Sequence, residues 1–233
     1  MSKAVIFFAP GLEECEGLLC VDLLRRSGVE VTIAAVGGEK IVKSARSISV
    51  VADALAEELD YSAFDAAILP GGIPGVDNLK ADATVRKVCT VPLIVKLSPQ
   101  AESIPEMCKA VEAAGADAIS LCNTFQACAI DLEKRRPVFN NTFAGLSGPA
   151  VRPIALRMVW QAVGAVNIPV VGLGGIATGR DALEFIMAGA AAVQVGTANF
   201  LDPKACTRIT NEIGQWMDAH SVKTLDEIRG CAR

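Results

Sequence analysis

The sequence contains a single histidine, His220, which lies close to the C-terminus. Its eight cysteines are scattered and form no C-x-x-C pair. A Ser/His/Asp or Cys/His catalytic set is therefore not expected, and a metal site is not expected either, because zinc sites draw on clustered Cys and His ligands. The cysteines are predicted to be reduced thiols of a cytoplasmic protein.

Long apolar runs and clusters of basic residues are also lacking. The first apolar run breaks at Pro10, which is too early for a secretory signal, and no stretch approaches the ~20 apolar residues that a membrane helix needs. The formal net charge is −4, without a Lys/Arg cluster. Neither a membrane nor a nucleic acid is therefore expected as a partner.

Aromatic residues make up only 5% of the chain, whereas hydrophobic residues make up 52% and charged residues 21%. This balance excludes a disordered chain and suits helices packed on a parallel sheet. The length of 233 residues allows one large α/β domain or two small ones.

Short β-branched segments alternate with amphipathic segments along the chain, which predicts βαβ units and a mainly parallel sheet. A hairpin is expected between 40–43 and 47–52, and a long loop from about 123 to 148. A glycine, Gly115 or Gly189, follows two of the predicted helices and is expected to form a left-handed cap. The predicted strands are 4–8, 30–35, 66–69, 93–96, 118–121, 169–172 and 192–196, and the predicted helices are 13–27, 105–114, 151–166 and 179–188.

Two glycine-containing turns follow neighbouring predicted strands near the C-terminus. One is VGLGGIATG (171–179), which opens a helix, and the other begins with Gly196 and Thr197. Backbone amides of such turns, with the field of the helix N-terminus, can hold a phosphate, although tight joints that need positive φ explain single glycines equally well. A dinucleotide fingerprint is rejected because no acidic residue ends the following strand.

Polar residues follow two other strands at the same predicted end of the sheet. Lys96 ends one strand, and Asn123 and Thr124 follow another. The alternatives are a solvent-exposed lysine and ordinary turn residues. In the N-terminal part, Glu13, Glu14 and Glu16 open a helix, where they complement its dipole, and LPGG (69–72) ends a strand with backbone amides able to receive an oxyanion.

From about residue 91 to the end, the chain resembles the C-terminal half of class 1 dihydroorotate dehydrogenases. The matching strings are VKLSP (95–99), AGLSGPA (144–150), GLGGI (172–176) and VGTANF (195–200). The resemblance implies the last four units of an FMN-binding (βα)8 barrel. It further implies that Gly174, Gly175, Gly196 and Thr197, with Gly148 nearby, hold the FMN phosphate, that Lys96 lies at the flavin pyrimidine edge, and that Asn123 and Thr124 contact the substrate.

Residues from about 3 to 88 resemble the flavodoxin-like ThiJ/PfpI superfamily, on the strings APGLEECE (9–16), DLLRR (22–26) and LPGG (69–72). The expected architecture is a chimera of 1–89 and 90–233, which form one combined α/β domain and close into a TIM-barrel-like parallel barrel. The alternative is an open doubly wound sheet.

Both resemblances lack a component of their chemistry. The catalytic base of the dehydrogenases belongs to the missing half, Cys128 follows the wrong strand to replace it, and no cysteine elbow follows the LPGG string. The leading hypothesis is a chimeric protein that binds FMN or a phosphate in its place, without catalysis. The alternatives are a flavin-dependent dihydroorotate dehydrogenase and a fold-recombination product without selected activity, with a glyoxalase or deglycase as a distant fourth. The expected partner is a small phosphate ligand, and a homodimer is one expected assembly.

Overall fold

The structure, a computed structural model, describes residues 2–82, 84–85 and 92–233. The chain divides into two compact units, Met1–Leu93 and Ile94–Arg233. The junction predicted at residue 89 lies outside the described residues. Each unit is described by itself below.

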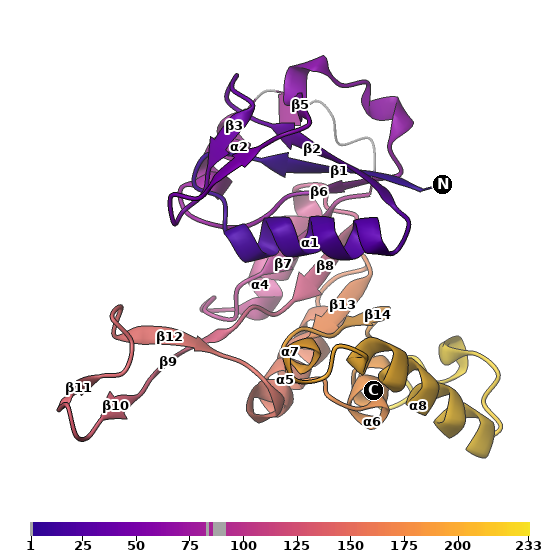
Figure 1. Ribbon diagram of the computed structural model, residues 1–233. Helices are drawn as coiled ribbons and strands as arrows, with labels where there is room; N and C mark the ends of the chain where they lie inside the picture. The colour runs from indigo at the N-terminus through magenta and orange to yellow at the C-terminus, as the bar shows by residue number, and fades with distance from the viewer. Residues whose placement is uncertain (1, 83, 86–91) are drawn as a thin grey trace. The chain divides into compact units, whose positions relative to one another are not determined.

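The first unit is an α/β unit with one parallel sheet and one hairpin (Figure 1). The described elements are β1 (Lys3–Phe8), α1 (Glu14–Arg26), β2 (Glu30–Ala35), β3 (Ile41–Lys43), β4 (Ser49–Val51), β5 (Ala54–Leu55), η1 (Ala56–Glu58), η2 (Tyr61–Ala63), β6 (Ala66–Ile68) and α2 (Gly75–Ala81).

The sheet of the first unit has the order β5-β2-β1-β6, and all its pairs are parallel. Strand β1 is buried on both faces, since Ile6 and Phe8 pack with Val21 of α1, while Val5 and Phe7 belong to the core of the opposite face. Apolar runs without alternation are typical of parallel strands that are covered on both sides. The first unit is therefore an open, doubly wound sheet.

The second unit is also built on parallel strands, and it carries a long excursion between β8 and α5. Its elements are β7 (Ile94–Leu97), α4 (Ile104–Ala113), β8 (Ala118–Leu121), β9 (Phe125–Cys128), β10 (Ile130–Asp131), β11 (Arg136–Pro137), β12 (Phe143–Leu146), η3 (Pro149–Val151), α5 (Arg152–Val163), β13 (Val170–Leu173), α6 (Gly179–Met187), β14 (Ala192–Gln194), α7 (Ala198–Leu201), α8 (Ala205–Ala219) and η4 (Leu225–Glu227).

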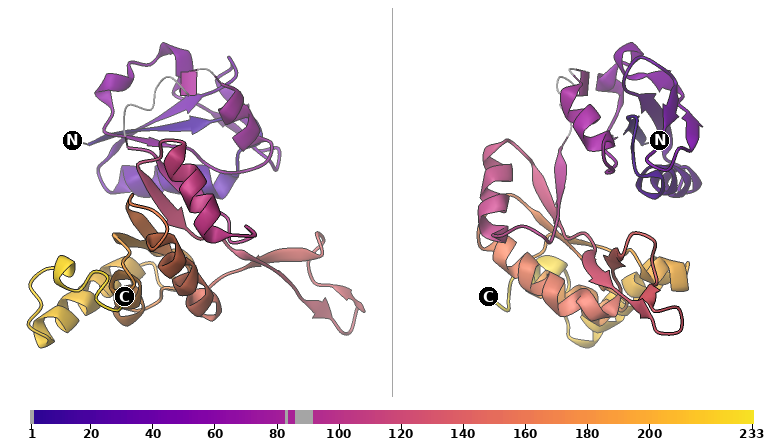
Figure 2. Two further views of the ribbon diagram at one scale, coloured as in Figure 1. Left: turned by 180° about the vertical axis from the view of Figure 1, so that it is seen from behind. Right: turned by 90° about the vertical axis from the view of Figure 1, so that its left-hand side faces the viewer.

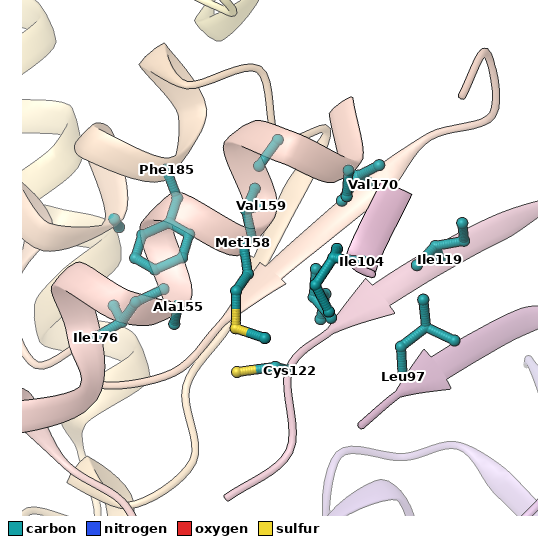
Figure 3. Packing of buried hydrophobic residues seen from close by; sticks show 14 of the residues in the cluster. Leu97, Ile104, Ile119, Cys122, Ala155, Met158, Val159, Val170, Ile176 and Phe185 are labelled. Atoms are coloured by element: carbon teal, nitrogen blue, oxygen red, sulfur yellow. The ribbon is translucent and has the colours of Figure 1, made fainter. Parts of the chain in front are cut away.

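Strands β7, β8, β13 and β14 form a parallel sheet in their sequence order. The main core lies between this sheet and its helices, where Ile119 of β8, Val159 of α5 and Phe185 of α6 are fully buried (Figure 3). Successive βα units with adjacent strands are the arrangement that the sequence predicted for this half.

The predicted barrel closure is not found among the described residues, where the parallel strands form two separate four-stranded sheets. Closure requires strands in consecutive order with helices on the outer face only. The first unit breaks this rule, because β2 and β6 lie on opposite sides of β1 and both faces of its sheet are packed. The alternative of an open doubly wound sheet describes the first unit.

The predicted loop from 123 to 148 was also wrong, because the segment forms two antiparallel ribbons. Strand β9 pairs with β12, and β10 pairs with β11 beyond them. The ribbon extends outward from the rest of the second unit (Figure 2). These strands have two to four residues each, and β11 contains Pro137, so no strand pattern marks them in the sequence.

Several other elements agree closely with the predicted ranges, whereas helices α2, α7 and α8 lie outside the predicted helix ranges. Strands β2 and β8 have the predicted bounds, and Gly115 and Gly189 take positive φ of 91° and 103° directly after the C-caps of α4 and α6. The hairpin β3–β4 also forms as predicted. Among the described residues, no helix is long and apolar enough to span a membrane.

Candidate phosphate-binding cleft

A cavity of about 380 Å³ opens at the carboxyl ends of the second unit's strands, where loops follow β7, β8, β12, β13 and β14. Its volume is within the range of ligand pockets, about 300–1,000 Å³. The structure brings together every residue that the sequence predicted for the site. The lining includes Lys96, Asn123, Thr124, Gly148, Gly174, Gly175, Gly196 and Thr197.

Three of these loops converge closely at Gly148. A Cβ atom added to Gly175 would lie 2.7 Å from the carbonyl oxygen of Gly148, and one added to Gly148 would lie 3.9 Å from Cγ2 of Thr197. The hydroxyl of Thr197 donates to Oγ of Ser147 at 2.8 Å, which ties the loop after β14 to the loop after β12. We call this convergence of the three loops the glycine cradle.

Backbone amides of the glycine cradle are available to a ligand. Within the described part of the chain, the amides of Gly175, Gly196 and Thr197 donate no hydrogen bond. Gly174 and Gly175 both have positive φ, 125° and 76°, so the interpretation as a tight joint is correct for the backbone. The same turn also carries a backbone amide, that of Gly175, that donates no hydrogen bond among the described residues. Unpaired amides on converging loops are the donor set that binds an oxyanion.

The N-terminus of α6 does not offer the free amides that were predicted to help hold a phosphate. The carboxylate of Asp181 accepts hydrogen bonds from the amides of Ala177 and Thr178 at 3.0 and 2.9 Å, and Oε2 of Glu212 accepts from the amide of Gly179 at 2.5 Å. These carboxylates occupy the amides of Ala177, Thr178 and Gly179, as capping groups commonly do. A phosphate would therefore rely on the glycine cradle rather than on this helix.

Two arginines balance these carboxylates. Arg208 pairs with Glu212 at 2.8 Å and with Asp202 at 3.1 Å, and Arg152 pairs with Asp181 at 3.2 Å. The hydrogen bond from the Gly179 amide, followed by that from Arg208, lowers the pKa of Glu212 below its usual value. The carboxylates are therefore neutralised locally, which limits their repulsion of an anion in the cradle.

Lys96, Asn123 and Thr124 occupy another part of the cavity lining. Lys96 lies on β7 and is exposed, and the amide of Asn123 donates to the carbonyl of Leu97 at 3.3 Å, which ties the β8 loop to β7. Oδ1 of Asn123 accepts from the amide of Thr124 at 2.9 Å, so the turn interpretation is correct for this oxygen. The placement of both residues at the cavity agrees with the site interpretation as well.

Cys122 also lines the cavity, although it was not among the residues predicted for the site. It is 3% exposed, and burial raises the pKa of its thiol to about 11, although the charge of Lys96 acts in the opposite direction. Figure 3 shows its sulfur pointing toward the side chain of Met158. The available signal was its position between a buried strand and Asn123, which places it at the same end of the sheet.

The corresponding end of the first unit is occupied by its own carboxylates. Glu13 caps α1 through the amide of Glu16 at 2.8 Å, which agrees with the predicted structural role. Oε2 of Glu16 accepts from the amide of Gly71 at 2.7 Å, and buried Glu14 accepts from Oγ of Ser44 at 2.8 Å. The expectation that the LPGG turn can receive an oxyanion is therefore wrong for the Gly71 amide.

The second unit is thus an α/β unit with a cleft at the carboxyl ends of its parallel strands, lined by backbone amides that donate no hydrogen bond among the described residues. Residues 27–217 match the sequence profile of the dihydroorotate dehydrogenase family. The chain belongs to this family. The matched range includes most of the first unit and most of the second.

Curated relatives carry the name dihydroorotate dehydrogenase B (NAD(+)), catalytic subunit. The relative from Petrotoga mobilis is 58% identical over 146 residues, which cover 63% of this chain and 49% of the relative. The relative from Alkaliphilus metalliredigens is 41% identical over 214 residues, which cover 90% of this chain and 70% of the relative. The chain spans about half the length of the first of these relatives.

Among solved structures, oxidized DJ-1 from Toxoplasma gondii is 27% identical, with a TM-score of 0.36 over 52% of this chain and 55% of DJ-1. A score this low does not establish a shared fold.

Among the described residues, no group of three or more His, Cys, Asp or Glu side chains could hold a metal ion.

Proposed function

We propose that the second unit binds FMN, with its phosphate in the glycine cradle. The observation that carries this proposal is the convergence of three loops with amides that make no other hydrogen bond in the described part of the chain. The amides of Gly175, Gly196 and Thr197 would hold the phosphate oxygens. Charge-assisted hydrogen bonds of this kind are roughly twice as strong as neutral ones.

Bound FMN would supply hydride-transfer chemistry at the cavity. The ammonium group of Lys96 would place a positive charge beside the flavin and favour its reduced, anionic form. Asn123 and Thr124 would offer an amide and a hydroxyl to a polar substrate. The resemblance to dihydroorotate dehydrogenases motivates these roles.

We further propose that this chain binds the cofactor without turnover. A general base must lie within hydrogen-bond reach of the proton that it takes. Besides Lys96 and Arg208, the titratable residues of the described lining are Cys122 and Asp202. Cys122 stays protonated at neutral pH because its pKa is about 11, and Asp202 is engaged by Arg208. Neither is suited to act as the base.

A flavin titration tests the binding proposal. Purified protein is added to FMN, and flavin fluorescence is followed, with riboflavin, which lacks the phosphate, as the matched ligand. Quenching of FMN, and much weaker quenching of riboflavin, is the expected result. An FMN signal unchanged at high micromolar protein would refute the proposal.

The second candidate is a flavin-dependent dihydroorotate dehydrogenase, which the names of the relatives favour. Reduction of a redox dye by dihydroorotate in the presence of FMN distinguishes it. A rate equal to the enzyme-free blank is expected, and a rate that rises in proportion to protein concentration would establish turnover.

We also propose that the chain is a chimera of a flavodoxin-like unit and a half-barrel. The doubly wound order of the first sheet and the consecutive order of the second support this origin. Thermal melting tests whether a phosphate site was retained. A melting temperature that rises with FMN or phosphate is expected, whereas one that is insensitive to both would favour a recombined fold without selected activity.

A further inference from the structure

The short helix α7 places large apolar side chains at the cavity of the second unit (Figure 1). Phe200 is 79% exposed, and Leu201, at 84%, is the most exposed large apolar residue in the described part of the chain. Both line the cavity, together with Leu146 of β12, which is 44% exposed. We call these three residues the apolar shelf. An exposed apolar patch beside a cavity marks an interaction site.

Helix α7 is held in place at both ends. Nδ2 of Asn199 donates to the carbonyl of Val195 at 2.7 Å, which ties the start of the helix to the end of β14. At the other end, the amide of Asp202 donates to the carbonyl of Ala198 at 2.9 Å, and the carboxylate of Asp202 pairs with Arg208 at 3.1 Å. The helix therefore presents its apolar side chains at a fixed place, as a preorganised binding surface requires.

The apolar shelf begins one helical turn from the glycine cradle. Thr197 of the cradle directly precedes α7, and its carbonyl accepts a hydrogen bond from the amide of Phe200 at 3.1 Å. An α-helix rises about 5.4 Å per turn. A ligand whose phosphate lies in the cradle therefore reaches the shelf only with atoms beyond the phosphate itself, and inorganic phosphate leaves the shelf in water.

The rest of the cavity lining indicates the chemistry of those further atoms. Val151 and Ile176 are buried and Leu173 is half-buried, so much of the wall is apolar, with a few polar side chains such as Lys96 and Asn123. Apolar walls with few polar groups are typical of sites for planar organic ligands. A sugar would lose the hydration of its hydroxyl groups against such a wall, whereas the faces of an aromatic ring have none to lose.

We propose that the apolar shelf packs against the planar ring of an aromatic phosphate ester, and that it thereby selects FMN over phosphates that carry only a sugar or no organic group. This inference rests on the proposed FMN site and adds the contacts that recognise the ring. Partial burial of one large apolar side chain is worth about tenfold in affinity. The alternative occupant of the shelf is a protein, and the continuity of the shelf with the cavity favours the ligand.

Calorimetric titrations of the full-length protein with FMN, ribose 5-phosphate and inorganic phosphate test this proposal. The wild type is expected to bind FMN at least tenfold more tightly than ribose 5-phosphate. Phe200→Ser and Leu201→Ser should each weaken FMN binding about tenfold and leave the affinity for ribose 5-phosphate unchanged. Phe200→Tyr, which keeps the ring, should bind FMN like the wild type. The matched control is Ile73→Ser in the first unit, where Ile73 is 83% exposed, and it should leave all three affinities unchanged.

Melting curves without ligand verify that each variant folds. Unchanged FMN affinity in the double variant Phe200→Ser/Leu201→Ser, or equal losses of affinity for FMN and ribose 5-phosphate, would overturn the role of the shelf. If FMN binding survives the double variant but is weakened in Gly196→Ala, the shelf proposal fails while the phosphate site in the cradle stands. A wild-type protein that binds none of the three ligands would overturn both proposals.

Discussion

Gly196 offers a sharp test of the glycine cradle, because its substitution separates binding from folding. A Cβ atom added at this position finds no other atom within 4 Å, and the backbone does not have the positive φ that disfavours other residues. Gly196→Ala should therefore fold as well as the wild type, or be more stable by about 0.4–1 kcal/mol through a less flexible unfolded chain.

The same methyl group would enter the open space beside the cradle amides. If it displaces the phosphate from one charge-assisted hydrogen bond, the loss is about 1.5–3 kcal/mol. A change of about 1.4 kcal/mol is tenfold in affinity, so the FMN dissociation constant should rise by roughly ten- to a hundredfold. The assay is the flavin fluorescence titration, combined with thermal melting of each variant.

Gly214→Ala is the matched control. Gly214 lies in α8, and its added Cβ atom also meets nothing within 4 Å. This variant should bind FMN like the wild type. If Gly196→Ala also binds FMN with unchanged affinity, the reasoning that places the phosphate in the cradle is refuted.

Three further predictions concern stability. Phe185→Ala removes a fully buried ring and should lower the urea-unfolding free energy by about 3–5 kcal/mol, and a loss below 1 kcal/mol would contradict the described core. Thr178→Ala removes the side-chain cap of α6 and should cost about 0.5–2 kcal/mol, seen as a lower melting temperature, whereas an unchanged temperature would show that the cap is not formed. Burial raises the pKa of the Cys122 thiol to about 11, against 9.0 for an unburied thiol. The stability that depends on this neutral thiol is therefore fully present below pH 9 and is lost as the pH rises to 11. Between pH 8.5 and 11 the wild type should therefore lose about 2–3 kcal/mol more than Cys122→Ala, and parallel losses would show that the thiol is not buried.

The sequence predicted much of the local structure, because its signals are local. Continuous apolar runs marked β1, β8 and β13, and glycines after helices marked the caps at Gly115 and Gly189. The candidate site was predictable for the same reason. Parallel strands bring their carboxyl ends to one edge, so Lys96 and Asn123 could be assigned to the same site from strand endings alone.

The features that the sequence did not predict depend on contacts between distant residues. The pairing of β9 with β12 joins short strands separated by a hairpin, and no pattern marks it. The carboxylate of Glu212 reaches the amide of Gly179 from α8, 33 positions away, and thereby occupies the helix end that appeared open to a ligand. The prediction of barrel closure was wrong because the strand order of the first unit depends on the direction of each crossover connection. The residue pattern of a single strand carries no information about that direction.

The convergence at Gly148 has a consequence for folding. The loops of the glycine cradle come from segments around residues 148, 175 and 196, which are brought together only when the parallel strands are paired. An anion held by all of them would link three distant parts of the chain and bind only the folded unit. The unfolding temperature would then rise with the concentration of this anion. Melting curves recorded at increasing phosphate concentration would therefore report whether the sheet is assembled.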